Sequence, residues 1–192
     1  MAKHIDYYFT PVSPWAYLGH ARFMEIARRH GAQVSAKPVD YGVIFPQSGG
    51  LPLAKRAPQR QAYRLQELAR WKAFLGVPLN THPRYFPADA TLAACVIAAA
   101  PADARLALAG DFMRAVWVEE ANIADPATVA AIAARHGIAD AAAAAARGRP
   151  VYEANTQEAV ARHVFGAPTY AYRDELFWGQ DRLDFLDRAL ND

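Results

Sequence analysis

The chain has 192 residues, a length that suits one large domain or one domain carrying an insertion. Its residues are 53% hydrophobic and 21% charged with a net charge of +2, a balance that gives no indication of a nucleic-acid or membrane partner. A single cysteine, Cys95, excludes an intramolecular disulfide, a two-cysteine redox centre and a zinc site built from several cysteines.

The N-terminal region predicts a β-α-β unit. Residues 4–10 combine β-branched and aromatic side chains in rough alternation, which is typical of a strand. Ser13 is a favoured helix N-cap and Pro14 suits the first helical position, so we expect a helix that ends near Gly31. Residues 32–40 return to an extended pattern.

The middle of the chain predicts an all-helical block. Residues 41–58 are centred on "PQSGGLP" and predict a loop. Caps or breakers bound four expected helices at 59–76, 88–100, 102–120 and 125–137. Residues 139–166 are rich in alanine, which has the highest helix propensity, and predict further helix.

The C-terminal region predicts a β-hairpin over residues 167–180, with Arg173 and Asp174 at its turn, and a closing helix after it. The order β-α-β, helical block, α-β-β-α resembles the thioredoxin fold. We therefore expect an α/β protein with a thioredoxin-like fold and a large all-helical insertion between its two halves. The expected parts are 1–42 for the first half, 43–150 for the insertion and 151–192 for the second half.

The start of the first helix is the expected reactive position. Thioredoxin-like enzymes carry Cys-x-x-Cys there, whereas this chain has Ser13-Pro14-Trp15-Ala16, so the protein itself cannot exchange disulfides. A helix N-terminus still stabilises a thiolate through unpaired N–H groups and a partial positive charge. The Ser13 hydroxyl could donate a hydrogen bond to a ligand's sulfur, an interaction worth about 1.5–3 kcal/mol. Ser13 is equally explained as a helix cap, and the two roles are compatible.

Four motifs in order, "FTPVSPWAYLG", "RQAYRLQELARWKAFLGVPL", "VFGAPTY" and "FWGQDRL", resemble those of the 2-hydroxychromene-2-carboxylate isomerases. These enzymes are relatives of the kappa-class glutathione transferases in the DsbA-like group. The resemblance runs essentially end to end. It implies a glutathione cofactor, a small-molecule aromatic substrate and a homodimer. The implied reaction is a reversible addition of the glutathione thiolate to the conjugated or hemiketal system of the substrate.

The resemblance also implies roles for individual residues in binding glutathione. Ser13 matches the residue that contacts the sulfur, and Arg60 lies near a basic position that meets the glycyl carboxylate. Ala167 precedes a proline that is cis in the family, Pro168, and matches the residue whose backbone pairs with the cysteinyl part. Gln180 and Asp181 match the pair that binds the γ-glutamyl end.

Several of these positions have a simpler structural explanation. Asp181 could cap the closing helix, and Pro168 could be an ordinary proline of an edge strand. Trp15, Phe45 and Tyr85 are core residues by default, although each could line a hydrophobic substrate pocket. Cys95 lies in an apolar stretch and is expected to be a buried, inert thiol.

The second substrate is left open by the sequence. Several relatives carry an asparagine after glycine where this chain has Gly49 and Gly50, and a lysine of some isomerases has no match in "DYGVIFPQ". A kappa-like glutathione transferase or peroxidase is therefore an alternative, as is a non-catalytic thioredoxin-like module that binds extended peptides by adding a strand.

The remaining expectations concern location and metal. The first ten residues contain Lys3, His4 and Asp6 and do not form a signal peptide, and no apolar run is long enough to cross a bilayer. We expect a cytoplasmic protein. The six histidines show no ligand spacing, so we expect no metal site.

Overall fold

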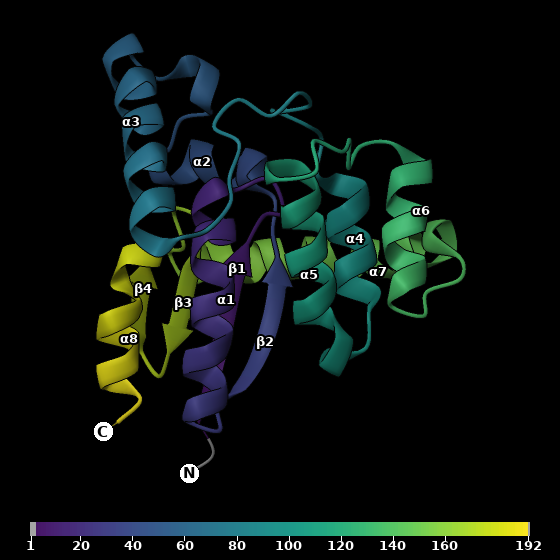
Figure 1. The fold of residues 1–192 in the computed structure, drawn as a ribbon. Coiled ribbons are helices and arrows are strands. Elements are labelled where there is room, and N and C mark those ends of the chain that lie inside the picture. The colour runs from purple at the N-terminus through teal and green to yellow at the C-terminus, as the bar shows by residue number, and fades with distance from the viewer. Residues whose placement is uncertain (1–2, 192) are drawn as a thin grey trace.

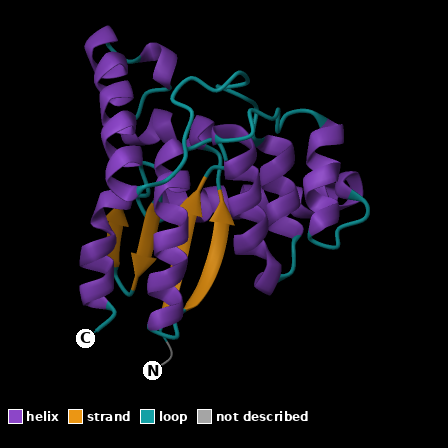
Figure 2. Cartoon of the chain, viewed as in Figure 1, coloured by secondary structure: helices purple, strands orange, loops and turns teal. Residues whose placement is uncertain are grey.

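The computed structural model describes residues 3–191. Its centre is one mixed sheet of four strands in the order β2-β1-β3-β4 (Figure 2). β1 pairs in parallel with β2 and antiparallel with β3, and β3 pairs antiparallel with β4. The predicted β-α-β and β-β-α halves therefore meet in a single sheet. The strands are β1 (His4–Phe9), β2 (Gln33–Pro38), β3 (Thr169–Tyr172) and β4 (Glu175–Trp178).

Helices cover both faces of this sheet and extend beyond its β2 edge. In Figure 1, α1 and α8 lie in front of the sheet, α7 passes behind it, and α4, α5 and α6 form a layer on the far side of β2. The α-helices are α1 (Pro14–Arg29), α2 (Tyr41–Ser48), α3 (Pro58–Leu75), α4 (Thr91–Ala99), α5 (Ala102–Trp117), α6 (Pro126–Arg135), α7 (Ala141–Ala161) and α8 (Leu183–Ala189). Among residues 3–191, no helix combines the length and apolar character needed to cross a membrane.

The central strand β1 supplies side chains to the cores on both faces of the sheet. Tyr7 is fully buried and packs with Phe23 of α1 in the main core. Tyr8 is also fully buried but belongs to a second cluster with Ile44 of α2 and Ala159 of α7. This division follows from the two-residue period of a strand, which sends successive side chains to opposite faces.

The loop predicted over residues 41–58 is wrong in its first half, where the structure has helix α2. Asp40 provides the N-cap, because its Oδ1 accepts a hydrogen bond of 2.7 Å from the N–H of Gly42. Pro46 lies inside the helix, and Gly49 ends it with a left-handed φ of 73°. A short 3₁₀ turn, Leu53–Lys55, follows. The helix is only two turns long, and its proline and glycines concealed it in the sequence.

The predicted helical block and hairpin are confirmed, with one change at the end of the block. α7 runs without interruption from Ala141 to Ala161 and includes Pro150. The expected boundary at residue 150 thus falls inside a helix, and the helical segment between the two halves of the sheet continues to residue 161. The hairpin turn lies at Arg173 and Asp174 as predicted, with Arg173 at a positive φ of 54°.

A buried histidine on α1 makes the stability of this fold dependent on pH. His20 is 6% exposed, its Nε2 lies 3.0 Å from the carbonyl oxygen of Leu106, and its Nδ1 has no partner among residues 3–191. Burial lowers the pKa of His20 to about 4, from an ordinary value near 6.5. The unfolded chain therefore binds a proton at a higher pH than the folded protein does.

We expect the free energy of unfolding to fall as the pH drops from about 6.5 to about 4, by as much as about 3 kcal/mol from His20 alone. Urea unfolding of the wild type and of His20→Gln across this range measures the contribution as the difference between their pH slopes. The exposed His82→Gln is the control and should keep the wild-type slope. Equal slopes in all three proteins would contradict the prediction.

Candidate active site

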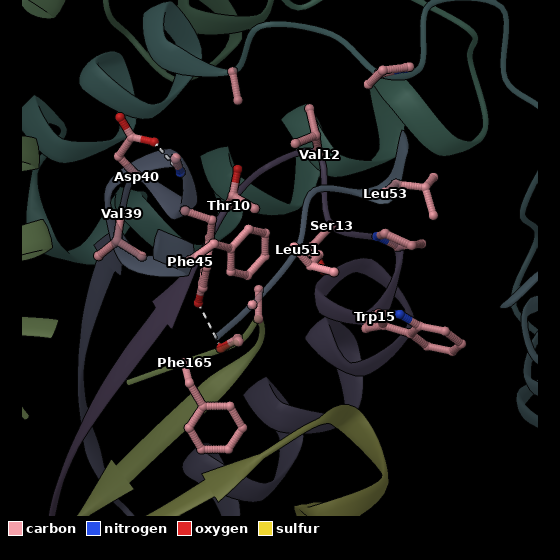
Figure 3. A pocket seen from close by; sticks show the side chains of 18 of the residues that line it. Thr10, Val12, Ser13, Trp15, Val39, Asp40, Phe45, Leu51, Leu53 and Phe165 are labelled. Carbon is pink, nitrogen blue, oxygen red and sulfur yellow. Dashed lines mark hydrogen bonds between the residues drawn. The ribbon is translucent and has the colours of Figure 1, made fainter. Parts of the chain in front are cut away.

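A pocket of about 820 Å³ opens where the first helix begins. Figure 3 shows Ser13 at the start of α1, with Thr10 and Phe45 on one side in this view and Trp15 on the other. Both halves of the sheet and the helical segment between them contribute to the wall. The lining segments are residues 10–15, 39–53, 56–64, 86–91 and 165–167, together with Tyr152 and Trp178, each in part.

Ser13 caps α1 and leaves two hydrogen-bond donors without a partner at the pocket. Its Oγ accepts a bond of 3.1 Å from the N–H of Ala16, and its carbonyl oxygen accepts one of 3.0 Å from Tyr17. Pro14 has no N–H. Within the described residues, the Trp15 N–H and the Ser13 O–H have no acceptor. Together with the positive end of the helix dipole, these two donors favour an anion.

The segment before β3 offers a second set of open backbone groups. The Ala167–Pro168 peptide bond is cis, and Ala167 lines the pocket. The neighbouring carbonyls are occupied, because Gly179 donates to Pro168 at 2.8 Å and the Tyr41 hydroxyl donates to Gly166 at 2.7 Å. The N–H and carbonyl of Ala167 itself have no partner within residues 3–191. They can therefore pair with an extended backbone laid along this edge.

Three arginines and two aspartates give the pocket its charge. Arg56, Arg60 and Arg64 all line it, and none of them forms an ion pair with a described residue. Asp40 and Asp89 line it too; Asp40 is the N-cap of α2, and Asp89 accepts a hydrogen bond from the N–H of Thr91, the first residue of α4. The three arginines are therefore available to form ion pairs with a ligand.

The structure brings five of the predicted site residues together in this pocket. They are Ser13, Arg60 and Ala167 from the expected glutathione set, and Trp15 and Phe45 from the expected substrate set. They come from the start of α1, from α2, from α3 and from the segment before β3.

The other four predicted residues lie outside the pocket lining. Pro168 is buried behind Ala167, and Tyr85 stacks its ring against Arg84 at the surface. Gln180 is 2% exposed and packs against Gly19 of α1, while its Oε1 has no partner among the described residues. Phe86 lines the pocket instead of its neighbour Tyr85.

Asp181 lies at the surface beside the end of β4. Its carboxylate forms an ion pair of 2.8 Å with Arg182. It does not cap the closing helix, since α8 begins after Arg182 without a side-chain cap. The alternative structural explanation for this residue is therefore wrong.

Sequence reasoning missed several of the lining residues, among them Arg64, Phe86, Tyr152 and Trp178. The sequence does contain a signal for Arg64, because a residue four positions after Arg60 lies on the same face of a helix. The sequence contains no such signal for Tyr152, since this residue reaches the pocket only through the packing of α7 behind the sheet.

Comparison with known proteins agrees with this architecture. A family model described as a DSBA-like thioredoxin domain matches residues 4–191. The 2-hydroxychromene-2-carboxylate isomerase of Sphingobium xenophagum is 31% identical over 197 residues, which cover 100% of both chains. The enzyme of the same name from Pseudomonas putida is 28% identical and covers 97% of this chain and 93% of its own.

Solved structures give the same result. A 2-hydroxychromene-2-carboxylate isomerase matches with a TM-score of 0.80 and 25% identity, covering 98% of this chain and 94% of that one. The cytosolic disulfide reductase DsbM from Pseudomonas aeruginosa, solved with GSH, matches with a TM-score of 0.68 and 20% identity over 98% of this chain and 100% of its own, a likeness of fold alone. The chain belongs to the DSBA-like thioredoxin domain family and, within it, to the 2-hydroxychromene-2-carboxylate isomerases, a family of isomerases, as its four motifs predicted.

Proposed function

We propose that the protein is a glutathione-dependent isomerase of a conjugated acid like 2-hydroxychromene-2-carboxylate. The observation that carries the proposal is the pair of unpartnered donors at the start of α1, the Ser13 O–H and the Trp15 N–H. The chain has no thiol at this position to occupy them. A sulfur anion supplied by a ligand is the natural acceptor, because helix N-termini and hydroxyl donors both lower the pKa of a thiol.

The residues of the pocket fit glutathione in three places. Ser13 and Trp15 would hold the sulfur, and the open N–H and carbonyl of Ala167 would pair with the cysteinyl backbone. Arg60 would meet the glycyl carboxylate. Asp181 would bind the γ-glutamyl ammonium only after its ion pair with Arg182 breaks. This ion pair is exposed, so breaking it costs little free energy.

The size and lining of the pocket support a second ligand beside glutathione. Its volume of about 820 Å³ is near the upper end of ordinary small-molecule pockets. Phe45, Trp15 and Phe86 provide apolar surface for a flat ring system. The protein would hold the two reactants together, which replaces a bimolecular encounter by an oriented one.

Glutathione, when bound, would supply a thiolate that adds to a conjugated carbon of the substrate, allows the former double bond to rotate and leaves unchanged as the bond re-forms. Ser13 and Trp15 would stabilise the negative charge on sulfur before addition and after departure. No electrons are gained or lost in this sequence, so the chain needs no redox group of its own. Cys95 takes no part, because it is buried and burial raises the pKa of its thiol.

A direct test is to follow isomerisation of 2-hydroxychromene-2-carboxylate with glutathione, with S-methylglutathione and with neither. Because S-methylglutathione has the same carboxylates and backbone but no thiol, it should bind in competition with glutathione and support no turnover. Equal rates with and without glutathione would contradict the proposal, as would turnover with the methylated analogue.

A further inference from the structure

Arg64 places its guanidinium group beside two aromatic rings at the wall of the pocket. Its central carbon lies 5.1 Å from the centre of the Phe86 ring and 5.9 Å from that of Trp117. Trp117 is fully buried, and Phe86 lines the pocket with Arg64. These contacts restrict the movement of the guanidinium and reduce the conformational freedom that it would lose on binding a ligand.

The guanidinium has no polar partner in the folded chain. Among residues 3–191, no hydrogen bond or ion pair involves Arg64, although other arginines of α3 and its surroundings have them: Arg70 pairs with Glu67 at 2.5 Å, and Arg56 donates to the carbonyl of Leu51 at 2.8 Å. The Arg64 nitrogens are not among the sealed polar atoms without a partner, so solvent in the pocket reaches them. Their donors are thus available to a ligand.

Burial and a neighbouring charge both act against this group in the absence of a ligand. Partial burial, with Arg56 nearby, lowers the pKa of Arg64 to about 10. Placing a charge in such a position without a counter-ion costs free energy, and an incoming carboxylate would recover it through paired, charge-assisted hydrogen bonds.

The acidic residues of the pocket do not fill this role. Asp40 accepts from the N–H of Gly42 at 2.7 Å, and Asp89 accepts from the N–H of Thr91 at 2.8 Å. Asp40 is therefore the N-cap of α2, Asp89 is held by a backbone N–H at the start of α4, and neither forms an ion pair with Arg64.

We infer that Arg64 binds the carboxylate of a ligand in this pocket, with Phe86 and Trp117 holding its guanidinium in place. The choice of ligand rests on the proposed function, which offers two candidate carboxylates here: the glycyl carboxylate of glutathione, whose other carboxylate belongs to its γ-glutamyl end, and the carboxylate of the conjugated substrate. Arg60 lies one helical turn before Arg64 and also lines the pocket, so α3 presents two unpaired guanidinium groups to these two acids.

The test measures binding by calorimetry for the wild type, Arg64→Met and Arg64→Lys, with Arg70→Met as the matched control on the exposed side of the same helix. Four probes separate the two sources. Glutathione is compared with its C-terminal amide, in which the glycyl carboxylate is replaced by an uncharged carboxamide, and coumarin-3-carboxylate, a stable bicyclic acid, is compared with its own carboxamide.

We expect Arg64→Met to bind one of the two acids roughly 10- to 100-fold more weakly than the wild type does, the range of a charge-assisted hydrogen bond. Arg64→Lys should lose less affinity for that acid. If the source is the glycyl carboxylate of glutathione, the loss is absent with the C-terminal amide of glutathione. If it is the substrate, the loss appears with the coumarin acid and is absent with the carboxamide. Arg70→Met should bind all four probes as the wild type does. Unchanged binding of both acids by Arg64→Met, or a wild type that binds neither, would overturn the inference.

The same titrations distinguish this inference from the proposed function. A wild type that binds the coumarin acid through Arg64 but does not bind glutathione contradicts the glutathione-dependent reaction and supports the carboxylate site. If the wild type isomerises the substrate with glutathione and Arg64→Met binds both acids normally, the glutathione-dependent reaction is supported and the carboxylate site at Arg64 is contradicted. Binding of the carboxamide by Arg64→Met shows that the variant pocket remains folded.

Discussion

Replacing Ser13 by alanine should lower kcat/KM for the glutathione-dependent reaction by about 10- to 100-fold. The substitution removes the hydroxyl that faces the pocket, so the first turn of α1 keeps only backbone donors: the Trp15 N–H and the Ala16 N–H, which the Ser13 Oγ accepts from in the wild type. Losing a charge-assisted hydrogen bond worth about 1.5–3 kcal/mol corresponds to one to two pKa units. The pKa of the thiol of bound glutathione should therefore rise toward its free value in the variant.

The ultraviolet absorbance of the thiolate measures this shift directly, in titrations of the glutathione complex from about pH 5 to pH 9. A thiol pKa that is lowered on the wild type and restored in Ser13→Ala would support the assigned role. An unshifted pKa on the wild type would remove the nucleophile from the proposed reaction and favour a peptide-binding module.

The control for Ser13→Ala must separate its two roles, because the Ser13 Oγ also caps α1 through the N–H of Ala16. Asp140→Ala removes an equivalent cap, since the Asp140 carboxylate accepts a bond of 2.9 Å from the N–H of Ala143 at the start of α7, outside the pocket lining. Each variant should lose about 1 kcal/mol of stability. Only Ser13→Ala should lose activity, and an equal loss in both would show that capping alone explains the effect.

The parts of the fold that sequence reasoning predicts are those fixed by local chemistry. Ser13 before Pro14 is a capping pattern that acts within one turn, and the hairpin turn at Arg173 and Asp174 is set by the polar pair between two apolar runs. α2 was missed because its length is close to the minimum for a helix and Pro46 lies within it. Its stability comes from Ile44 packing under the sheet, a contact that no local pattern displays.

The site is less predictable because long-range packing decides which groups are left without partners. The open backbone of Ala167 depends on Tyr41 and Gly179 occupying the carbonyls on either side of it. Whether Tyr85 or Phe86 lines the pocket depends on the path of one loop. Arg64 becomes a binding residue only because Phe86 and Trp117, far apart in the sequence, lie against it.

The largest effect on stability should come from Gly148→Ala, at the contact between α4 and α7. A Cβ at Gly148 would overlap the carbonyl oxygen of Cys95 and lie 2.8 Å from its carbonyl carbon and 3.0 Å from the backbone nitrogen of Ala99. These are backbone atoms of a helix, so no side chain can rotate to make room. The two helices would have to separate, at a cost of about 3 kcal/mol or more of unfolding free energy.

The matched control is Gly110→Ala in α5, where a Cβ would meet only the His20 ring, at 3.0 and 3.1 Å. Both substitutions gain about 1 kcal/mol of helix propensity, because alanine replaces glycine inside a helix. The difference between them in urea unfolding therefore compares an overlap with backbone atoms, which cannot rotate away, with a close contact to a single side-chain ring. Because α4 and α7 bring Thr91 and Tyr152 to the pocket wall, Gly148→Ala should also weaken ligand binding. If Gly148→Ala is as stable as Gly110→Ala, α4 and α7 are not in backbone contact at this point.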